Sequence, residues 1–72
     1  MTPQCKAVLD FMRRRGSITP RQASHFLGVD RLAARIYDLR HDPKVKWEIV
    51  GDWKKIKTRY GDGKVKRYRL KR

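Results

Sequence analysis

The sequence predicts an α+β fold in which three helices are followed by a two-stranded antiparallel β-hairpin. Three segments that open with a Thr-Pro or Asp signal carry apolar residues at helical spacing. After residue 46 the apolar and aromatic residues adopt a spacing typical of strands, and Gly61-Asp62-Gly63 is a strong hairpin-turn signal. At 72 residues, the chain forms one domain with a small core.

The first helix is predicted over residues 3–15. Thr2 provides a cap, and Pro3 suits the first helical position because its missing N–H would be unpaired there in any case. Gly16 ends the helix, after three arginines that favour the negative end of the helix dipole. The predicted buried stripe follows i, i+3, i+4, i+7 spacing and consists of Cys5, Val8, Leu9 and Met12, widened by Phe11.

A second helix over residues 20–27 and a third over residues 31–41 are predicted to flank a tight turn. Thr19-Pro20 repeats the first capping signal, and Asp30 is expected to cap the third helix. Gly28 can take the positive φ that the turn requires. The expected inner faces are Ala23, Phe26 and Leu27 in the second helix, and Leu32, Ile36 and Leu39 in the third.

The hairpin is predicted over residues 47–60 and 64–70. Gly51 suggests a bulge or bend in its first strand. In so small a protein the aromatic residues are expected to pack in the core or the hairpin, and these are Trp47, Trp53, Tyr60 and Tyr68. The basic residues on the hairpin are Lys54, Lys55, Lys57, Arg59, Lys64, Lys66, Arg67 and Arg69.

The charge of the chain points to a polyanionic partner. There are 20 Lys and Arg against 7 Asp and Glu, a formal net charge of +13. So large a charge repels itself, and nucleic acid is the leading partner to offset it. Cys5 is the one cysteine, which excludes an internal disulfide and fits a reducing cytoplasm. We expect a cytoplasmic protein without a membrane partner, because no apolar run approaches the length of a membrane span.

The order helix, helix-turn-helix, hairpin resembles the winged helix-turn-helix superfamily. The segments ITPRQASHFLGVDRLAARIYDLR and TRYGDGKVKRYRL are similar to small helix-turn-helix proteins of bacteriophages and prophages. The resemblance implies binding to double-stranded DNA, with residues 31–41 in the major groove and residues 57–67 as a wing on the backbone or minor groove. It also suggests a minimal first strand at residues 17–18. The chain departs from the family by leaving the third helix through residues 41–44 without the usual Gly.

The third helix supplies the predicted base contacts. Arg31 and Arg35 can each donate two hydrogen bonds to guanine, or they contact phosphate, pair with Asp38 or lie in solvent. Ala34 permits close approach and can touch a thymine methyl group, or it is a neutral helix former. Asp38 is either a partner of Arg35 at i+3 or an acceptor from cytosine. Tyr37 is open to two interpretations, because it can reach phosphates or pack under the hairpin.

Phosphate contacts are predicted at two further places. Thr19, Arg21 and Gln22 open the second helix, whose free N–H groups can bind phosphate oxygens; capping alone also explains Thr19. On the hairpin the residues nearest the predicted turn are the candidates, namely Arg59, Lys64, Lys66 and Arg67. The alternative for these four is a solvated edge that prevents strand-to-strand aggregation.

Several functions remain open at this point. A transcription regulator and an excisionase-like architectural factor both fit, with weak or DNA-induced self-association and an unidentified recombinase or polymerase partner. An RNA-binding or ribosome-associated module is the alternative, and exposure of Trp47 or Trp53 would favour it. A protein-interaction domain has no reason to carry this charge. No enzyme, cofactor or metal is predicted, since His25 and His41 lack metal-ligand spacing and no nucleophile has a base within reach.

Overall fold

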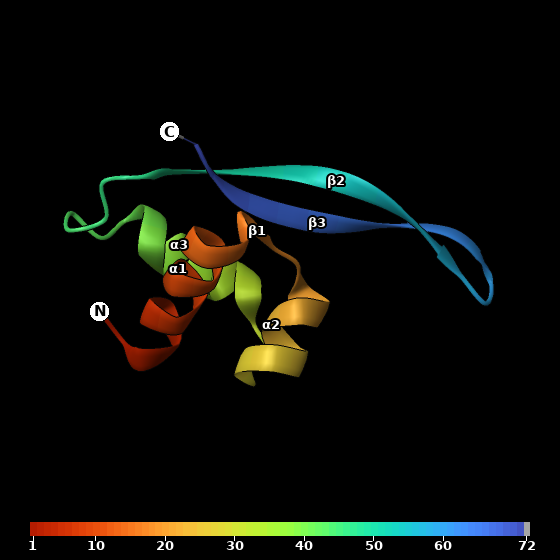
Figure 1. The fold of residues 1–72 in the computed structure, drawn as a ribbon, viewed down its shortest axis with the longest axis horizontal. Coiled ribbons are helices and arrows are strands. Elements are labelled where there is room, and N and C mark those ends of the chain that lie inside the picture. The colour runs from red at the N-terminus through yellow and green to blue at the C-terminus, as the bar shows by residue number, and fades with distance from the viewer. Residues whose placement is uncertain (72) are drawn as a thin grey trace.

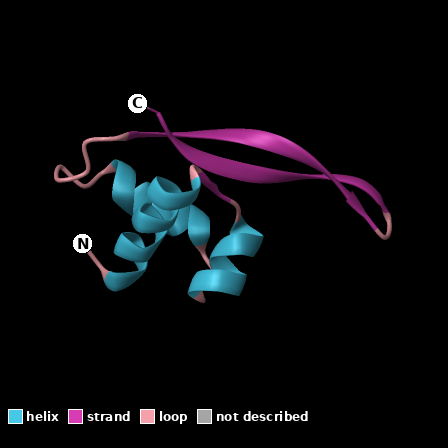
Figure 2. Cartoon of the chain, viewed as in Figure 1, coloured by secondary structure: helices cyan, strands magenta, loops and turns pink. Residues whose placement is uncertain are grey.

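Three helices pack beneath an antiparallel sheet in the computed structural model, which describes residues 1–71 (Figure 1). The elements are α1 (Pro3–Arg15), β1 (Ser17–Ile18), α2 (Pro20–Leu27), α3 (Leu32–Arg40), β2 (Glu48–Thr58) and β3 (Gly61–Lys71). The strand order is β1-β3-β2. The β2–β3 hairpin extends well past the helices and gives the molecule a longest dimension of 41 Å (Figure 2). The predicted α+β class is therefore confirmed.

The first helix has the predicted bounds. The Thr2 hydroxyl accepts a hydrogen bond from the Cys5 amide at 3.2 Å, and the Gly16 amide donates to the Met12 carbonyl at 2.8 Å. These contacts satisfy one orphan backbone group at each end of the helix. The predicted stripe is buried in full, including Phe11. Both ends of α1 are thus set by residues within the sequence of the helix and its immediate neighbours.

The core joins this stripe to the other elements. It adds Ile18 from β1, Ala23 from α2, Val29 from the turn, Leu32, Ile36 and Leu39 from α3, and Ile49 and Tyr68 from the sheet. The expectation for Phe26 was wrong, because 55% of this residue is exposed. Ala23 and the half-buried Leu27 occupy the inner side of α2, and the Phe26 ring lies at its rim, stacked on Phe11 with centroids 5.9 Å apart.

The helix-turn-helix differs from prediction at the start of α3. The turn itself contains Gly28 at φ 66°, as expected. Asp30 does not cap α3, which begins at Leu32 after Arg31 and ends at Arg40. Arg31 takes the capping position with φ −117° and ψ 66°, and its side chain makes no capping bond. The Asp30 carboxylate accepts a hydrogen bond from the Ser24 hydroxyl at 3.2 Å instead, so it links the turn back to α2.

Strand β1 adds a third strand at the base of the hairpin. Ser17 pairs with Arg69 and Ile18 pairs with Tyr68. This confirms the minimal first strand that the resemblance suggested. Because Ile18 is fully buried, the strand also fixes the sheet to the helical core.

The predicted bulge at Gly51 was wrong. Pairing of β2 with β3 is continuous from Glu48 with Lys71 to Thr58 with Gly61, and Gly51 faces Tyr68 within it. The glycine instead leaves room for the Lys66 side chain, because a Cβ at this position would lie 2.6 Å from Cε of Lys66. The Lys66 stem therefore crosses the strand where Gly51 has no side chain.

The hairpin turn lies two residues earlier than predicted. Arg59 and Tyr60 form it, whereas Asp62 and Gly63 belong to β3 and pair with Lys57 and Ile56. Gly61 directly follows the turn at φ 115°, a value that only glycine adopts without strain. The glycine is thus needed after the turn. The Thr58 hydroxyl completes it by donating to the Gly61 carbonyl at 2.7 Å and accepting from the Tyr60 amide.

The prediction that the aromatic residues pack in the core or the hairpin is correct for two of the four residues. Tyr68 is buried, and Trp47 is half-buried with the Arg13 guanidinium 4.9 Å from its ring centroid. Trp53 is 65% exposed and Tyr60 is 97% exposed, so for these two the prediction was wrong. Trp53 lies in β2 and Tyr60 lies in the turn of a hairpin that extends past the helices (Figure 1).

The last turn of α3 is connected directly to the start of β2. Nε and Nη2 of Arg40 donate to the Ile49 carbonyl at 3.2 and 3.0 Å. The intervening chain turns at Asp42, whose carboxylate accepts from the Lys44 amide and whose carbonyl accepts from the Val45 amide. These bonds set the hairpin relative to α3 in place of the usual Gly exit.

Candidate nucleic-acid interface

The start of α2 is largely occupied by its own capping contacts. The Thr19 hydroxyl accepts from the Gln22 amide at 3.2 Å, and the Gln22 side-chain oxygen accepts from the Thr19 amide at 3.0 Å. Pro20 has no N–H, and the Ala23 amide donates to the Thr19 carbonyl. Of the donors in the first turn of α2 within residues 1–71, the backbone amide and the exposed guanidinium of Arg21 are therefore the ones that can bind a phosphate.

The exposed face of α3 carries small and aromatic side chains. Arg31 and Ala33 are exposed, and Ala34 is half-buried. Tyr37 is 62% exposed, so of its two interpretations packing under the hairpin is wrong. Its ring lies 4.1 Å from that of His41, and His41 Nδ1 is 2.8 Å from the Tyr37 carbonyl oxygen. The two tilted rings lie on the C-terminal half of this face.

Arg35 is directed toward α1. Its Nη1 donates to the Gln4 side-chain oxygen at 3.1 Å, and its Nη2 forms an ion pair with Asp38 at 3.1 Å. Nε of Arg35 is buried without a hydrogen-bond partner in the described chain. The Arg35 side chain is 29% exposed. It therefore holds α1 and α3 together in the unbound protein.

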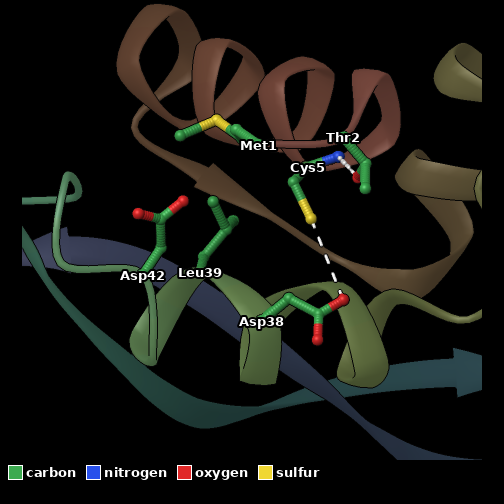
Figure 3. Close-up of a pocket in the computed structure, with 6 residues that line it drawn as sticks. All are labelled: Met1, Thr2, Cys5, Asp38, Leu39 and Asp42. Atoms are coloured by element: carbon green, nitrogen blue, oxygen red, sulfur yellow. Dashed lines mark hydrogen bonds between the residues drawn. The ribbon is translucent and has the colours of Figure 1, made fainter.

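Asp38 belongs to the same contact between α1 and α3 (Figure 3). Its second partner is the buried Cys5, whose Sγ donates to Asp38 Oδ2 at 4.0 Å. A surface hollow of about 310 Å³ lies beside them, lined by Met1, Thr2, Cys5, Asp38, Leu39 and Asp42. Its two carboxylates make this hollow unfavourable for an anion. The pairing of Asp38 with Arg35 at i+3, one of the two roles predicted for this carboxylate, is present.

A groove joins the starts of α2 and α3 to the hairpin. It has a volume of about 300 Å³ and is lined by Pro20, Asp30, Arg31, Leu32, Ala33, Ala34 and Tyr68. Small side chains at Ala33 and Ala34 leave the α3 backbone accessible there. Ala33 was missed in the sequence, although its place beside Ala34 at the start of a helix pointed to the same open surface.

The side chains of the hairpin fall into two faces, which its register defines. The face that covers the helices at the base is called here the inner face. It carries the cross-strand pairs Ile49–Leu70, Gly51–Tyr68, Trp53–Lys66, Lys55–Lys64 and Lys57–Asp62. The first two pairs close the core, and the last three extend past it. The inner face thus changes from apolar to mostly basic along the hairpin.

The opposite face of the hairpin contains an ion pair. Arg67 Nη2 lies 3.1 Å from Asp52 Oδ2, and Arg67 Nε also donates to this carboxylate. These hydrogen bonds from Arg67 hold the pKa of Asp52 below its ordinary value, and the same carboxylate raises the pKa of Arg67. The predicted phosphate contact Arg67 is therefore partly neutralised, whereas Arg59 in the turn and Lys64 on the inner face are exposed and have no ion pair within residues 1–71.

No group of three or more His, Cys, Asp or Glu side chains within residues 1–71 could hold a metal ion. In the same part of the chain, no helix has the length and apolar character that crossing a bilayer requires.

The family model of the winged helix-turn-helix domain matches residues 3–72, which is almost the whole chain. The chain belongs to the winged helix-turn-helix family. No curated protein and no solved structure matches it. Winged helix-turn-helix domains are in general DNA-binding modules and are typically not enzymes. In this winged helix-turn-helix protein, α2 and α3 are the two helices of the motif, and the β2–β3 hairpin is the wing.

Proposed function

We propose that this protein binds double-stranded DNA with α3 in the major groove and the wing on the backbone or minor groove. The observation that carries the proposal is the groove in which Arg31, at the N-cap of α3, and Ala33 and Ala34 of α3 line one wall together with Tyr68 of the wing. One duplex can contact both elements because the two face a common surface. The net charge of +13 supplies the attraction for phosphates.

Within this proposal the residues have different tasks. Arg31 is free to contact a guanine, and Ala33 and Ala34 allow the helix to enter the groove closely. Arg21, Arg59 and Lys64 bind phosphates, since their charged groups are exposed. Arg35 and Asp38 position α3 against α1. The capping box of Thr19 and Gln22 orders the α2 start that presents Arg21.

The proposed biological role is a transcription regulator or an excisionase-like architectural factor. Both roles need specific duplex binding, and they differ in whether the DNA is bent. A circular-permutation mobility assay on the selected binding site separates them. If the mobility of the complex varies with the position of the site within the fragment, the DNA is bent, and this supports the architectural factor. Uniform mobility supports the regulator.

A binding experiment tests the duplex proposal itself. Sites are selected from a random duplex pool, and affinity is then measured by fluorescence anisotropy across a salt series. We expect the logarithm of the association constant to fall linearly with the logarithm of salt, with a slope of about −4 to −7 for five to eight phosphates. Arg31→Ala should weaken the selected site by about 1–3 kcal/mol and relax specificity at one base pair.

Arg14→Ala is the matched control, because it removes the same charge from an exposed position on α1 outside the groove. It should reduce affinity slightly and equally for all sequences. If Arg31→Ala and Arg14→Ala behave alike, α3 does not make the proposed base contact. If no duplex is preferred over single strands, the duplex proposal itself fails.

A single-stranded RNA partner is the second candidate function, and one specific observation favours it. Trp53 is exposed on a basic sheet, as in proteins that stack single-stranded bases. Oligonucleotides of matched sequence as duplex DNA, single-stranded DNA and RNA compete directly in the same anisotropy assay. Tighter binding of RNA than of duplex DNA would favour the RNA-binding module.

A further inference from the structure

The position of Trp53 is unusual for a tryptophan in a protein with so small a core. It lies on the inner face of the wing, one cross-strand pair beyond Gly51–Tyr68. Tyr68 is still buried there, whereas Trp53 is 65% exposed. Burial of a large aromatic side chain is among the strongest sources of stability available to a small domain. An indole that stays outside the core is therefore available for contact with a partner.

The structure around Trp53 orients a cation over the ring. Nζ of Lys66 lies 5.1 Å from the ring centroid. The Lys66 stem reaches this place across Gly51, where a Cβ would lie 2.6 Å from its Cε atom. The cation thus lies over the indole ring, while most of the Trp53 side chain remains open to solvent.

The next cross-strand pair on the inner face is a pair of like charges. Lys55 lies directly opposite Lys64, an arrangement that destabilises a hairpin. Both side chains are exposed, and neither forms an ion pair within residues 1–71. A bound anion between the two ammonium groups would remove this repulsion. The inner face therefore presents an aromatic ring and, one step along the strands, a site for an anion.

An aromatic ring beside a pair of cations matches the chemistry of an unpaired nucleotide. The base stacks on the indole, and its phosphate lies between the cations. A base within a duplex cannot use this site, because its two faces are already covered by its neighbours. We propose that Trp53, Lys66, Lys55 and Lys64 form a binding site for an unpaired nucleotide.

The source of that nucleotide follows from the position of the site. Tyr68 is adjacent to the Trp53–Lys66 pair on the inner face and also lines the groove with Arg31 and Ala34. A duplex seated on α3 therefore ends, or opens, beside Trp53. This inference rests on the proposed function, and it narrows the substrate to duplex DNA that adjoins a single-stranded segment.

The experiment compares a blunt duplex with the same duplex carrying a short oligothymidylate tail. It uses the Trp47→Phe background, in which Trp53 is the sole tryptophan. The tail should raise affinity about 5- to 150-fold, in line with about 1–3 kcal/mol for one stacked base, and should quench Trp53 fluorescence. Trp53→Leu should bring the ratio of tailed to blunt affinity close to one, and Trp53→Phe, which keeps a ring, should retain part of it.

Phe26→Leu is the matched control, because Phe26 is also an exposed aromatic residue but lies on α2. It should leave the ratio unchanged, and unfolding midpoints in urea show that every variant is folded. A ratio of one in the wild-type protein, with blunt duplex still bound, overturns the inference and leaves the proposed function standing. Absence of binding to blunt duplex at low salt means that the proposed function has failed. Oligouridylate RNA that binds alone as tightly as the tailed duplex overturns the assignment to DNA.

Discussion

The Arg40 guanidinium in the last turn of α3 donates two hydrogen bonds to the Ile49 carbonyl at the start of β2. This contact joins the helix proposed to enter the major groove to the wing proposed to bind the backbone. The two parts of the interface therefore keep a fixed relation when DNA is absent. The Asp42 turn between them adds two hydrogen bonds of its own.

Removal of this contact should cost stability and separate the two parts of the interface. We expect Arg40→Ala to lower the free energy of unfolding by about 1–2 kcal/mol, since hydrogen bonds from a charged donor are lost. Urea denaturation followed by circular dichroism measures this change. Arg40→Lys keeps the charge but cannot reproduce both bonds, so it should lie between wild type and Arg40→Ala. Equal stability of all three would show that the contact contributes nothing.

The position of the hairpin turn can be tested with two glycines. Gly61→Ala should destabilise the protein by about 1–3 kcal/mol, because alanine is strained at the φ of 115° found there. Gly63→Ala is the control, since its Cβ would meet the Thr58 methyl carbon at an ordinary 3.5 Å. Thermal or urea unfolding of the two variants measures this difference in stability. A larger loss at Gly63 than at Gly61 would favour the turn predicted from the sequence.

A side chain at Gly51 should displace Lys66 from Trp53. A Cβ would lie 2.6 Å from the Lys66 Cε atom, and the flexible end of the lysine can move away. We therefore expect Gly51→Ala in the Trp47→Phe background to change the fluorescence of Trp53 while lowering stability by less than about 1 kcal/mol. Lys66→Met, which lacks the cation, should give a similar fluorescence change. An unaltered spectrum in both variants would show that Lys66 does not lie over the ring in solution.

The Asp52–Arg67 pair gives stability that depends on pH. Hydrogen bonds from Arg67 lower the pKa of Asp52 in the folded protein. Stabilisation by the pair is thus complete above the unfolded pKa, about 3.9, and is lost as the pH falls through the lower folded value. The stability difference between wild type and Asp52→Asn should be present at pH 7 and disappear toward pH 2. A difference that stays constant over this range would exclude the ion pair as its source.

Local signals predicted most of this fold because the interactions behind them are local too. Thr2 and Thr19 cap their helices through amides three residues away, so the sequence contains both partners. Asp30 carried the same signal, but its carboxylate binds the Ser24 hydroxyl, a choice that depends on how α2 and α3 are placed. The turn was wrongly placed at Gly61-Asp62-Gly63 because glycine is common within hairpin turns. In this hairpin the glycine is needed at the position directly after the turn.

The interface was harder to predict because exposure depends on tertiary structure. Trp53 was assigned to packing on the ground that a small core needs aromatic residues. Its spacing of two and four residues from Lys55 and Lys57 indicated instead that it shares their face of the strand. Arg35 was chosen for a base contact from its place on α3, and its partner Gln4 is 31 residues away in the sequence. No pattern within α3 could reveal that bond.

The shortness of β1 has a consequence for the dynamics of the wing. Its two residues pair only with Arg69 and Tyr68, so from Arg67 outward the ribbon is two strands wide and carries mostly positive charge. Protection of amide protons from hydrogen exchange should therefore be high at Ile18 and Tyr68 and fall steeply toward Arg59. The outer ribbon can open without unfolding the core. A polyanion bound to the outer ribbon would favour its paired state. Part of the binding free energy would then be used to order the outer ribbon.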